Sequence, residues 1–543
     1  MDVHRSRTGE PLSDRVQVEV VRSTTPTALV VGGGHNGLVA ACYLARAGID
    51  VTVLEQSDKV GGGSRTDETI PGYRFDTHSA AHNIINMTDI PAELGLAEMG
   101  LEYREMDPFA VSVGADGKTI RFWRDVEATL DSIAEVAPAD VDGYRRFVED
   151  AMPIVRLAVA GVNAGASARR ELAMAGDRIL PVFRALQRHG GPFSLASTLL
   201  MPYGALLRRY LTTDAVMAPI GAFAAHGNAS PNDFGTAFSA IWQAVYHRHG
   251  QWHAVGGAQA LSDALARRLE AWGGTIRTSA DVTRIVQRDG VVQGVELASG
   301  ERLAAHVVVT ALDPRMALLD LLDPPLTGKV ADDLRVAHAG NAVQMVVHVA
   351  TDRLPAYPDA QPADWMGLQS YVDDFPSLER AFSAAQDRRL PEDPVPTYAF
   401  TPSAMDDTLA PEGHHTVYLA CPAAPAQVRG GWDAVAEQFT ERMIDTVERR
   451  APGFRDSIRG IAIRTPELME AELRWPGAHP MVLDLSLDQL VSARPTVALG
   501  GHSTPVRGLF ISGAGTAPIG GVAGTPGRAA AKAVLKTHPL RRR

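Results

Sequence analysis

Three glycines near the start of the chain have the spacing that brings a backbone close to a phosphate. Gly32, Gly34 and Gly37 form a G-x-G-x-x-G pattern, which directly follows the apolar run 28–31 and directly precedes a helical pattern. A strand, a glycine turn and a helix in this order are the context of a dinucleotide-binding fingerprint, in which the helix N-terminus faces the pyrophosphate. We therefore predict that this stretch binds a dinucleotide, an ordinary glycine-rich turn being the alternative.

A carboxylate and a second glycine loop extend this predicted site. Glu55 ends the predicted strand 50–54, about 20 residues beyond the glycines, where an acidic side chain holds the hydroxyl groups of a ribose. The loop that follows contains Gly62, Gly63 and Arg65. Glycine permits a close approach to a ligand, and arginine neutralises a phosphate or lies against a ring system. This loop is predicted to contact the same ligand, with a solvated surface loop as the alternative.

The end of the chain contains another glycine-rich junction. Residues 508–535 form a strand pattern, a crossing and a last helical pattern whose N-terminus would point its dipole at an electron-rich group. The glycines of this crossing are Gly513, Gly515, Gly520, Gly521, Gly524 and Gly527. Their density predicts a second contact with the same cofactor rather than only a tight crossing of the chain.

Histidines are the candidate acid–base groups, because the unperturbed pKa of imidazole lies near neutrality. The sequence offers His253, His82 and His226 as the main candidates, and each can equally be an ordinary buried histidine. The catalytic residue is therefore left unassigned. The run 247–253 contains three histidines but no acidic or cysteine neighbour and no H-E-x-x-H helix, so no metal site is predicted. The sequence also lacks the G-x-S-x-G elbow of a hydrolase.

Length and composition limit the number of domains and the classes of partner and location that the protein can have. A chain of 543 residues exceeds a single ordinary core, so two domains are expected. The net charge of −11 argues against a nucleic-acid partner. The two cysteines, Cys42 and Cys421, are far apart and predict neither a disulfide framework nor a dithiol centre. No signal peptide and no apolar run of about 18 residues is recognised, so a cytoplasmic protein is expected.

The elements that must position these residues are interleaved along the chain. Strand, helix and hairpin patterns return at 251–311 after a long helical block, which predicts a discontinuous nucleotide-binding domain. Within that block, helices are predicted at 145–162, 168–189 and 194–211. The last of these places apolar residues beside Arg208 and Arg209; we expect a core helix, and a peripheral membrane contact is left open.

The predicted division of the chain follows from these patterns. It consists of a disordered leader at 1–25, nucleotide-binding segments at 26–105, 251–323 and 495–543, a helical substrate or cap segment at 106–250 and a second substrate segment at 324–494. The last nucleotide-binding segment includes the C-terminal helix.

The motifs at both ends and in the middle of the chain resemble those of the phytoene desaturase (carotenoid desaturase and isomerase) group of FAD-dependent oxidoreductases. This group belongs to the amine-oxidase-like flavoprotein superfamily. The resemblance covers 27–536 and is strongest to the branch named after a pyridine nucleotide-disulphide oxidoreductase domain, although the cysteine pair of that name is absent. It implies an α/β fold in which a Rossmann-like FAD-binding domain of glutathione-reductase-like topology is interleaved with a mixed α+β substrate domain.

The resemblance also implies where FAD binds. The pyrophosphate would lie over the first glycines, Glu55 would hold the adenosine ribose and the backbone of Val282 the adenine edge. Arg65, together with Gly62 and Gly63, would lie toward the pyrophosphate or the flavin. At the C-terminal end, Gly515 and Thr516 would reach the ribityl side, and Gly521 and Val522 the flavin pyrimidine. Many flavoproteins have an acidic residue at the ribityl position, whereas this chain has glycine, alanine and threonine there.

The implied activity is dehydrogenation (desaturation) of an apolar or polyene-like small molecule by hydride transfer to flavin N5, as a dehydrogenase or an oxidase. A redox-neutral isomerase, or a flavin-stabilised binding or scaffold protein, is the alternative. The partner expected is a hydrophobic small molecule, and the electron acceptor and the formation of a homo-oligomer are left open.

Overall fold

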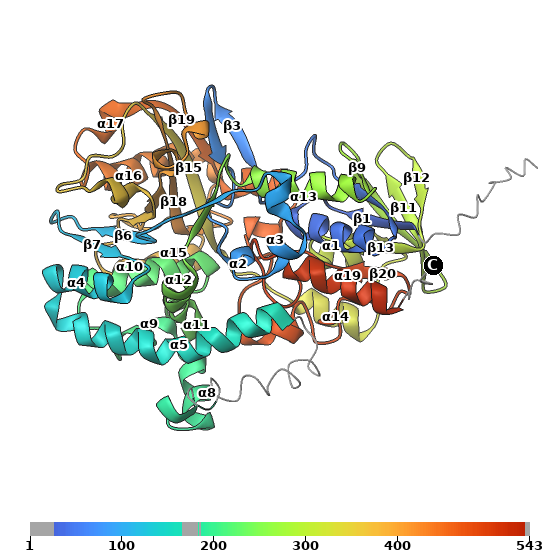
Figure 1. Cartoon of the computed structure of the whole chain (residues 1–543), viewed down its shortest axis with the longest axis horizontal. Coiled ribbons are helices and arrows are strands. Elements are labelled where there is room, and N and C mark those ends of the chain that lie inside the picture. The colour runs from blue at the N-terminus through green and yellow to red at the C-terminus, as the bar shows by residue number, and fades with distance from the viewer. Residues whose placement is uncertain (1–26, 165–182, 184–185, 538–543) are drawn as a thin grey trace, which may run out of the picture.

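The computed structural model describes residues 27–164, 183 and 186–537. The leader predicted at 1–25 and most of the helix predicted at 168–189 lie outside the described residues. The chain forms a nucleotide-binding domain and a larger mixed domain, which lie side by side in Figure 1.

The nucleotide-binding domain is built on a five-stranded parallel sheet. Its strand order is β20 (Leu509–Ile511), β13 (Val307–Thr310), β1 (Thr27–Val31), β2 (Asp50–Leu54) and β9 (Thr275–Arg277). The strands β1, β13 and β20 are short, mostly apolar and buried runs because helices or other layers cover both faces of a parallel sheet, whereas the edge strand β9 is more exposed. The predicted fold class is confirmed.

Two layers cover this sheet. One face packs against α1 (His35–Arg46), α13 (Gln259–Ala271) and α19 (Thr525–Thr537). The other packs against the antiparallel strands β10 (Val282–Arg288), β11 (Val291–Leu297) and β12 (Arg302–Ala304), and against α14 (Lys329–Val336). The pairing of β10 with β11 confirms the hairpin pattern predicted within 251–311.

The first and last helices of the chain are in direct contact. A Cβ at Gly527 would lie 2.2 Å from the backbone oxygen of Asn36, so only glycine permits this approach. In Figure 1, the blue α1 and the red α19 lie side by side. Segments from opposite ends of the sequence thus form one side of the same domain.

The second domain is built on a seven-stranded mixed sheet. Its order is β19 (Ile458–Arg464), β15 (Ala342–Thr351), β18 (His415–Pro425), β17 (Tyr398–Phe400), β16 (Leu368–Ser370), β6 (Ala110–Val113) and β7 (Thr119–Phe122). Side chains alternate between its faces, so that on β18 Val417 and Leu419 pack toward α16 (Ala436–Glu448), while Tyr418 faces the opposite side.

Helices cover that opposite side of the sheet. They are α4 (Val126–Val136), α5 (Val141–Ala164), α9 (Tyr203–Leu207), α10 (Asp214–Ala224), α11 (Ala237–Ile241), α12 (Gln243–His249) and α15 (Phe375–Gln386). The block 106–250, predicted as helical, also contributes β6 and β7. These two strands have four residues each, too short to give a strong alternating pattern.

The single helix predicted at 194–211 is wrong, because the chain forms α8 (Pro192–Leu200) and α9 instead. Pro202 has no N–H and keeps the preceding Met201 in an extended conformation. Tyr203 and Leu206 are buried, which confirms the core interpretation for α9, whereas Leu200 is half exposed.

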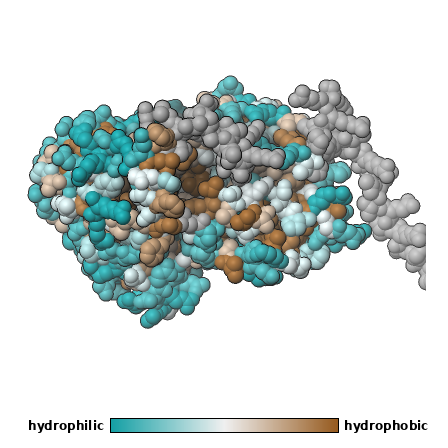
Figure 2. All heavy atoms as spheres, turned by 90° about the horizontal axis from the view of Figure 1, so that it is seen from below, coloured by the Kyte–Doolittle hydropathy of each residue, from teal (hydrophilic) through white to brown (hydrophobic). Residues whose placement is uncertain are grey.

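On the face seen in Figure 2, hydrophobic residues gather around a hollow. Within the described ranges, no helix combines the length and the apolar character needed to cross a bilayer.

Candidate active site

A narrow cleft of about 100 Å³ lies where β1 and β2 end, and the glycine loop lines it. Gly32 has a φ of +99°, in the region that favours glycine. Gly34 precedes α1, and no described side chain caps this helix N-terminus. A Cβ at Gly62 would lie 3.2 Å from the Cα of Gly34, so the two glycine loops touch backbone to backbone. The cleft therefore presents the first N–H groups of a helix to its interior, which is how proteins bind phosphate.

Glu55 lies in this cleft, as do Gly62, Gly63 and Val282. Its carboxylate accepts the backbone N–H of Gly33 at 2.7 Å and that of Ser57 at 2.9 Å. A carboxylate has about four acceptor sites, so both oxygens keep capacity for a ribose hydroxyl. The positions agree with the predicted contacts, which themselves stay predictions.

Five predicted cofactor residues lie outside the described lining of this cleft. Two of them, Gly521 and Val522, line the adjoining cavity instead. Arg65 is paired with Asp67 at 3.2 Å. The hydroxyl of Thr516 donates to the backbone oxygen of Gly513 at 2.9 Å. A Cβ at Gly515 would lie 2.8 Å from the side chain of Pro314. At this end the described lining of the cleft includes Gly513 and Ala514, which directly precede Gly515 and Thr516, and the predicted cofactor contacts of those two residues stay predictions.

A second cavity, of about 230 Å³, adjoins the cleft. The two cavities share four lining residues, which are His35, Gly63, Trp475 and Ala514. The walls of the second cavity come from α10 to α12, from the seven-stranded sheet and from the turn that contains Gly521 and Val522. Its described lining includes no Asp, Glu, Lys or Arg side chain. The cavity is therefore an apolar chamber that opens onto the nucleotide cleft.

Of the three candidate histidines, only His226 is among the described residues that line this cavity. His253 is held by Asp406, whose carboxylate lies 2.8 Å from its Nε2. The Nδ1 of His82 lies 3.0 Å from the hydroxyl of Tyr103, and burial lowers the pKa of this imidazole to about 3. His253 and His82 therefore lie outside the described lining of this cavity, and an acid–base role for any of the three histidines stays a prediction.

His35 lines both cavities, although the sequence analysis did not select it. Its Nε2 lies 3.0 Å from the backbone oxygen of Gly521, so this nitrogen carries the proton and donates. Burial lowers the pKa of His35 to about 4, which keeps the ring neutral. This contact ties the start of α1 to the turn 521–522. His35 occupies a variable position of the fingerprint, where the motif carries no residue-specific signal.

Comparison with known proteins identifies the family. The sequence model of the family described as "Flavin containing amine oxidoreductase" matches residues 37–441, which is most of the chain. The chain belongs to this family.

The relatives of this flavin-containing oxidoreductase include proteins of similar length. "Pyridine nucleotide-disulfide oxidoreductase domain-containing protein 2" of Rattus norvegicus is 29% identical to it, with 94% of this chain and 93% of the relative covered. "Phytoene desaturase (neurosporene-forming)" of Cereibacter sphaeroides is 27% identical, with 96% of each chain covered. Cyclohexylamine oxidase of Brevibacterium oxydans has a similar fold, with a TM-score of 0.57, 17% identity, and 95% of this chain and 100% of that chain covered. The predicted family is confirmed.

FAD is the cofactor of this oxidoreductase. The structure fits this dinucleotide, because the cleft combines an uncapped helix N-terminus with a carboxylate at the end of β2. The first glycine loop, Glu55 and Val282 would hold its adenosine and pyrophosphate, and the boundary between the two cavities would hold its flavin ring.

Glu55→Gln should lower the affinity for FAD by about tenfold, because an amide has one acceptor oxygen where the carboxylate has two. Titration of the apoprotein with FAD in a calorimeter measures this. Glu68→Gln is the matched control, since Glu68 is exposed and accepts the N–H of Gly72 outside the cleft. An unchanged affinity in Glu55→Gln would show that this carboxylate only holds the glycine loop.

Acid should destabilise the folded protein. Burial lowers the pKa of four buried histidines below the ordinary value of 6.5, to about 4 for His35 and His502 and to about 3 for His82 and His348. Above pH 6.5 these rings are neutral in both states. As the pH falls below 6.5, the unfolded chain takes up protons that the folded chain does not, so the free energy of unfolding decreases.

We expect a loss on the order of 8 kcal/mol between about pH 7 and pH 5, because each of the four buried histidines contributes about 1.4 kcal/mol per pH unit below pH 6.5. Urea unfolding at several pH values measures this loss. A free energy of unfolding that does not change between about pH 7 and pH 5 would show that these rings are hydrated or paired when charged.

Proposed function

We propose that the chain is an FAD-dependent dehydrogenase that removes two hydrogens from a small apolar molecule bound in the second cavity. The observation that carries this proposal is the sharing of four lining residues between the cofactor cleft and an apolar chamber. A substrate in that chamber lies next to the cofactor, and the described lining offers no charged side chain to bind an ionic substrate.

FAD, when bound, supplies an acceptor for a hydride at its N5. The residues of the chain bind and orient the substrate. Aromatic side chains from two elements, Trp242 beside α12 and Tyr398 on β17, form part of the apolar wall and exclude water. His35 keeps its proton on Nε2 toward Gly521, which fixes the boundary at which substrate and cofactor meet. The similarity to the phytoene desaturase of Cereibacter sphaeroides supports an unsaturated apolar substrate.

Anaerobic titration of the yellow holoenzyme with unsaturated hydrocarbons and alcohols of cavity size tests the proposal. A substrate should bleach the absorbance of the oxidised flavin and yield a product lighter by two hydrogens. A product of unchanged mass without bleaching would contradict the proposal and favour a redox-neutral isomerase. Under air, formation of hydrogen peroxide separates an oxidase from a dehydrogenase that needs another acceptor.

A cavity-filling variant links the reaction to the chamber. Ser239 lines the chamber, so Ser239→Phe should abolish bleaching while the flavin stays bound. Ser299 lies in an exposed turn between β11 and β12, so Ser299→Phe is the matched control and should bleach normally. Equal bleaching in the two variants would place the reaction elsewhere.

A further inference from the structure

Besides His35 at the boundary with the cleft, whose Nδ1 is buried without a described partner, two polar groups in the chamber have buried atoms without a partner among the described residues. Gln251 is 1% exposed, and neither its amide nitrogen nor its amide oxygen has a hydrogen-bond partner among the described residues. The Nε2 of His226 is also buried without a described partner. A buried, unpaired amide costs free energy, so a folded protein keeps one where a ligand completes the hydrogen bonds.

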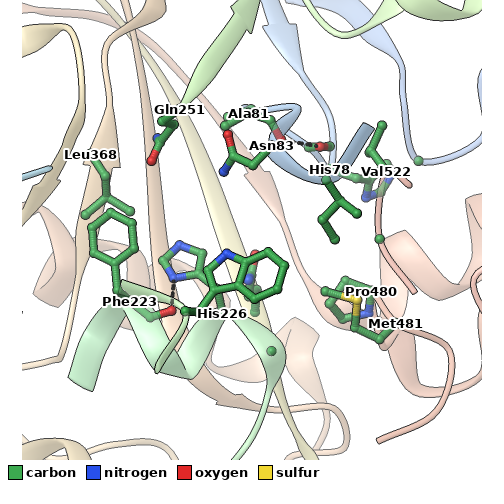
Figure 3. A pocket seen from close by; sticks show the side chains of 18 of the residues that line it. His78, Ala81, Asn83, Phe223, His226, Gln251, Leu368, Pro480, Met481 and Val522 are labelled. Atoms are coloured by element: carbon green, nitrogen blue, oxygen red, sulfur yellow. Dashed lines mark hydrogen bonds between the residues drawn. The ribbon is translucent and has the colours of Figure 1, made fainter. Parts of the chain in front are cut away.

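The local backbone holds Gln251 in place. Helix α12 ends at His249, and Gly250 follows with a φ of +72°, which turns the chain sharply. The backbone oxygen of Gln251 then accepts the N–H of Met106 at 2.8 Å. Its side chain lines the chamber, where Figure 3 shows it directed toward the ring of His226. The backbone of Gln251 is therefore held in place at the wall of the chamber.

The hydrogen bonds of His226 determine which proton its ring carries. Its Nδ1 lies 3.1 Å from the backbone oxygens of both Ala222 and Phe223, which can only accept, so Nδ1 carries the proton. Burial lowers the pKa of His226 to about 4, so the ring is neutral near pH 7. The Nε2 is then a hydrogen-bond acceptor, and a ligand must bring the donor.

The two groups lie at one end of the chamber. In Figure 3, Gln251 and His226 lie on the side of Phe223 and Leu368, opposite Val522. Val522 follows Gly521, which contacts His35 at the boundary with the cofactor cleft. The polar groups are therefore remote from the end where the cofactor would react.

We propose that Gln251 and His226 form a polar subsite that binds a hydroxyl group of an uncharged and otherwise apolar substrate. A hydroxyl both donates and accepts, which matches an imidazole acceptor together with an amide that offers both functions. The described lining holds no charged side chain to pair with a carboxylate or an ammonium group. This inference rests on the proposed function, since it names the class of molecule that the chamber orients.

Binding of three probes of matched carbon skeleton tests the subsite. Geraniol donates and accepts, its methyl ether only accepts, and 2,6-dimethylocta-2,6-diene does neither. Calorimetry with the FAD-loaded protein should show geraniol binding roughly tenfold more tightly than the ether, because the ether leaves the imidazole acceptor unpaired. Gln251→Met and His226→Phe should each remove most of this preference. Equal affinity for the three probes, or no detectable binding of geraniol, would overturn the proposal.

Thermal stability gives a second test that needs no ligand. Gln251→Met removes two unpaired polar atoms, so the melting temperature should stay the same or rise. Gln489→Met is the matched control, because this equally buried amide accepts the N–H of His338 at 2.8 Å and donates to the oxygen of His338 at 3.0 Å. Its melting temperature should fall by several degrees. A similar fall in Gln251→Met would show that its amide is already paired, against the proposal.

Flavin bleaching, recorded in parallel, separates this inference from the proposed function. A preference for the alcohol without bleaching by any substrate would reject the dehydrogenation and support the subsite. Bleaching by the alcohol and the hydrocarbon with equal affinity would support the dehydrogenation and reject the subsite.

Discussion

Gly34→Val should give a folded protein that carries less than about one tenth of the FAD of the parent, because the second glycine of the fingerprint lets the backbone approach the pyrophosphate. The chain itself has room for this change. A Cβ at Gly34 would meet only the backbone of Gly61 and Gly62, at 3.8 Å and 3.9 Å, and the φ of −68° suits any residue. The ratio of flavin absorbance to protein absorbance, with the melting temperature of the apoprotein, measures both effects.

A substitution at Gly37, three residues later, should affect folding rather than only FAD binding. A Cβ at Gly37 would lie 2.1 Å from the backbone oxygen of Gly32, so Gly37→Ala should destabilise the domain even without cofactor. Gly34→Ala should fold normally and bind FAD with an intermediate affinity. Full flavin occupancy in Gly34→Val would show that the pyrophosphate lies elsewhere.

Arg494→Lys should lower the free energy of unfolding by about 3 kcal/mol or more, since a buried ion and several acceptors lose their hydrogen bonds. The Arg494 side chain is completely buried, and this burial lowers its pKa to about 10. The guanidinium donates to five backbone oxygens, those of Met481, Leu483, Asp484, Gln489 and Ala514. A lysine has one nitrogen and three protons, so it cannot replace this planar fork.

This arginine also joins the two cavities, because Met481 lines the chamber and Ala514 lines both the chamber and the cleft. Urea unfolding of the holoenzyme measures the loss, and weaker FAD binding should accompany it. Arg507→Lys is the matched control, since Arg507 is exposed. Equal stability of the two variants would show that water replaces the guanidinium in this segment.

The nucleotide-binding domain was predictable because its signals are local. A fingerprint fixes the strand, the turn and the helix around Gly34, and the spacing to Glu55 places a carboxylate at the end of the next parallel strand. The strands β6 and β7 were missed because short strands are stabilised by their sheet neighbours rather than by a long pattern.

The chamber was less predictable because its residues come from distant parts of the chain. His253 and His226 look alike in the sequence. In the structure, the ring of His253 is hydrogen-bonded to Asp406, whereas His226, just after α10, lines the chamber. A glutamine in a loop, such as Gln251, carries no sequence signal. Only the folded structure shows that this amide is buried away from water without a described hydrogen-bond partner.

The contact between α1 and α19 also determines at which stage of synthesis this domain can complete its folding. During synthesis, β1 and its glycine loop leave the ribosome well before the edge strand β20 and the helix that covers α1, which belong to residues 509–537. Until then, the nascent domain exposes the apolar faces of β13 and α1, a surface that invites chaperones and aggregation. Flavin loading therefore has to wait until residues 509–537 have been made, and a premature stop just before β20 would yield a long polypeptide that cannot close around its cofactor.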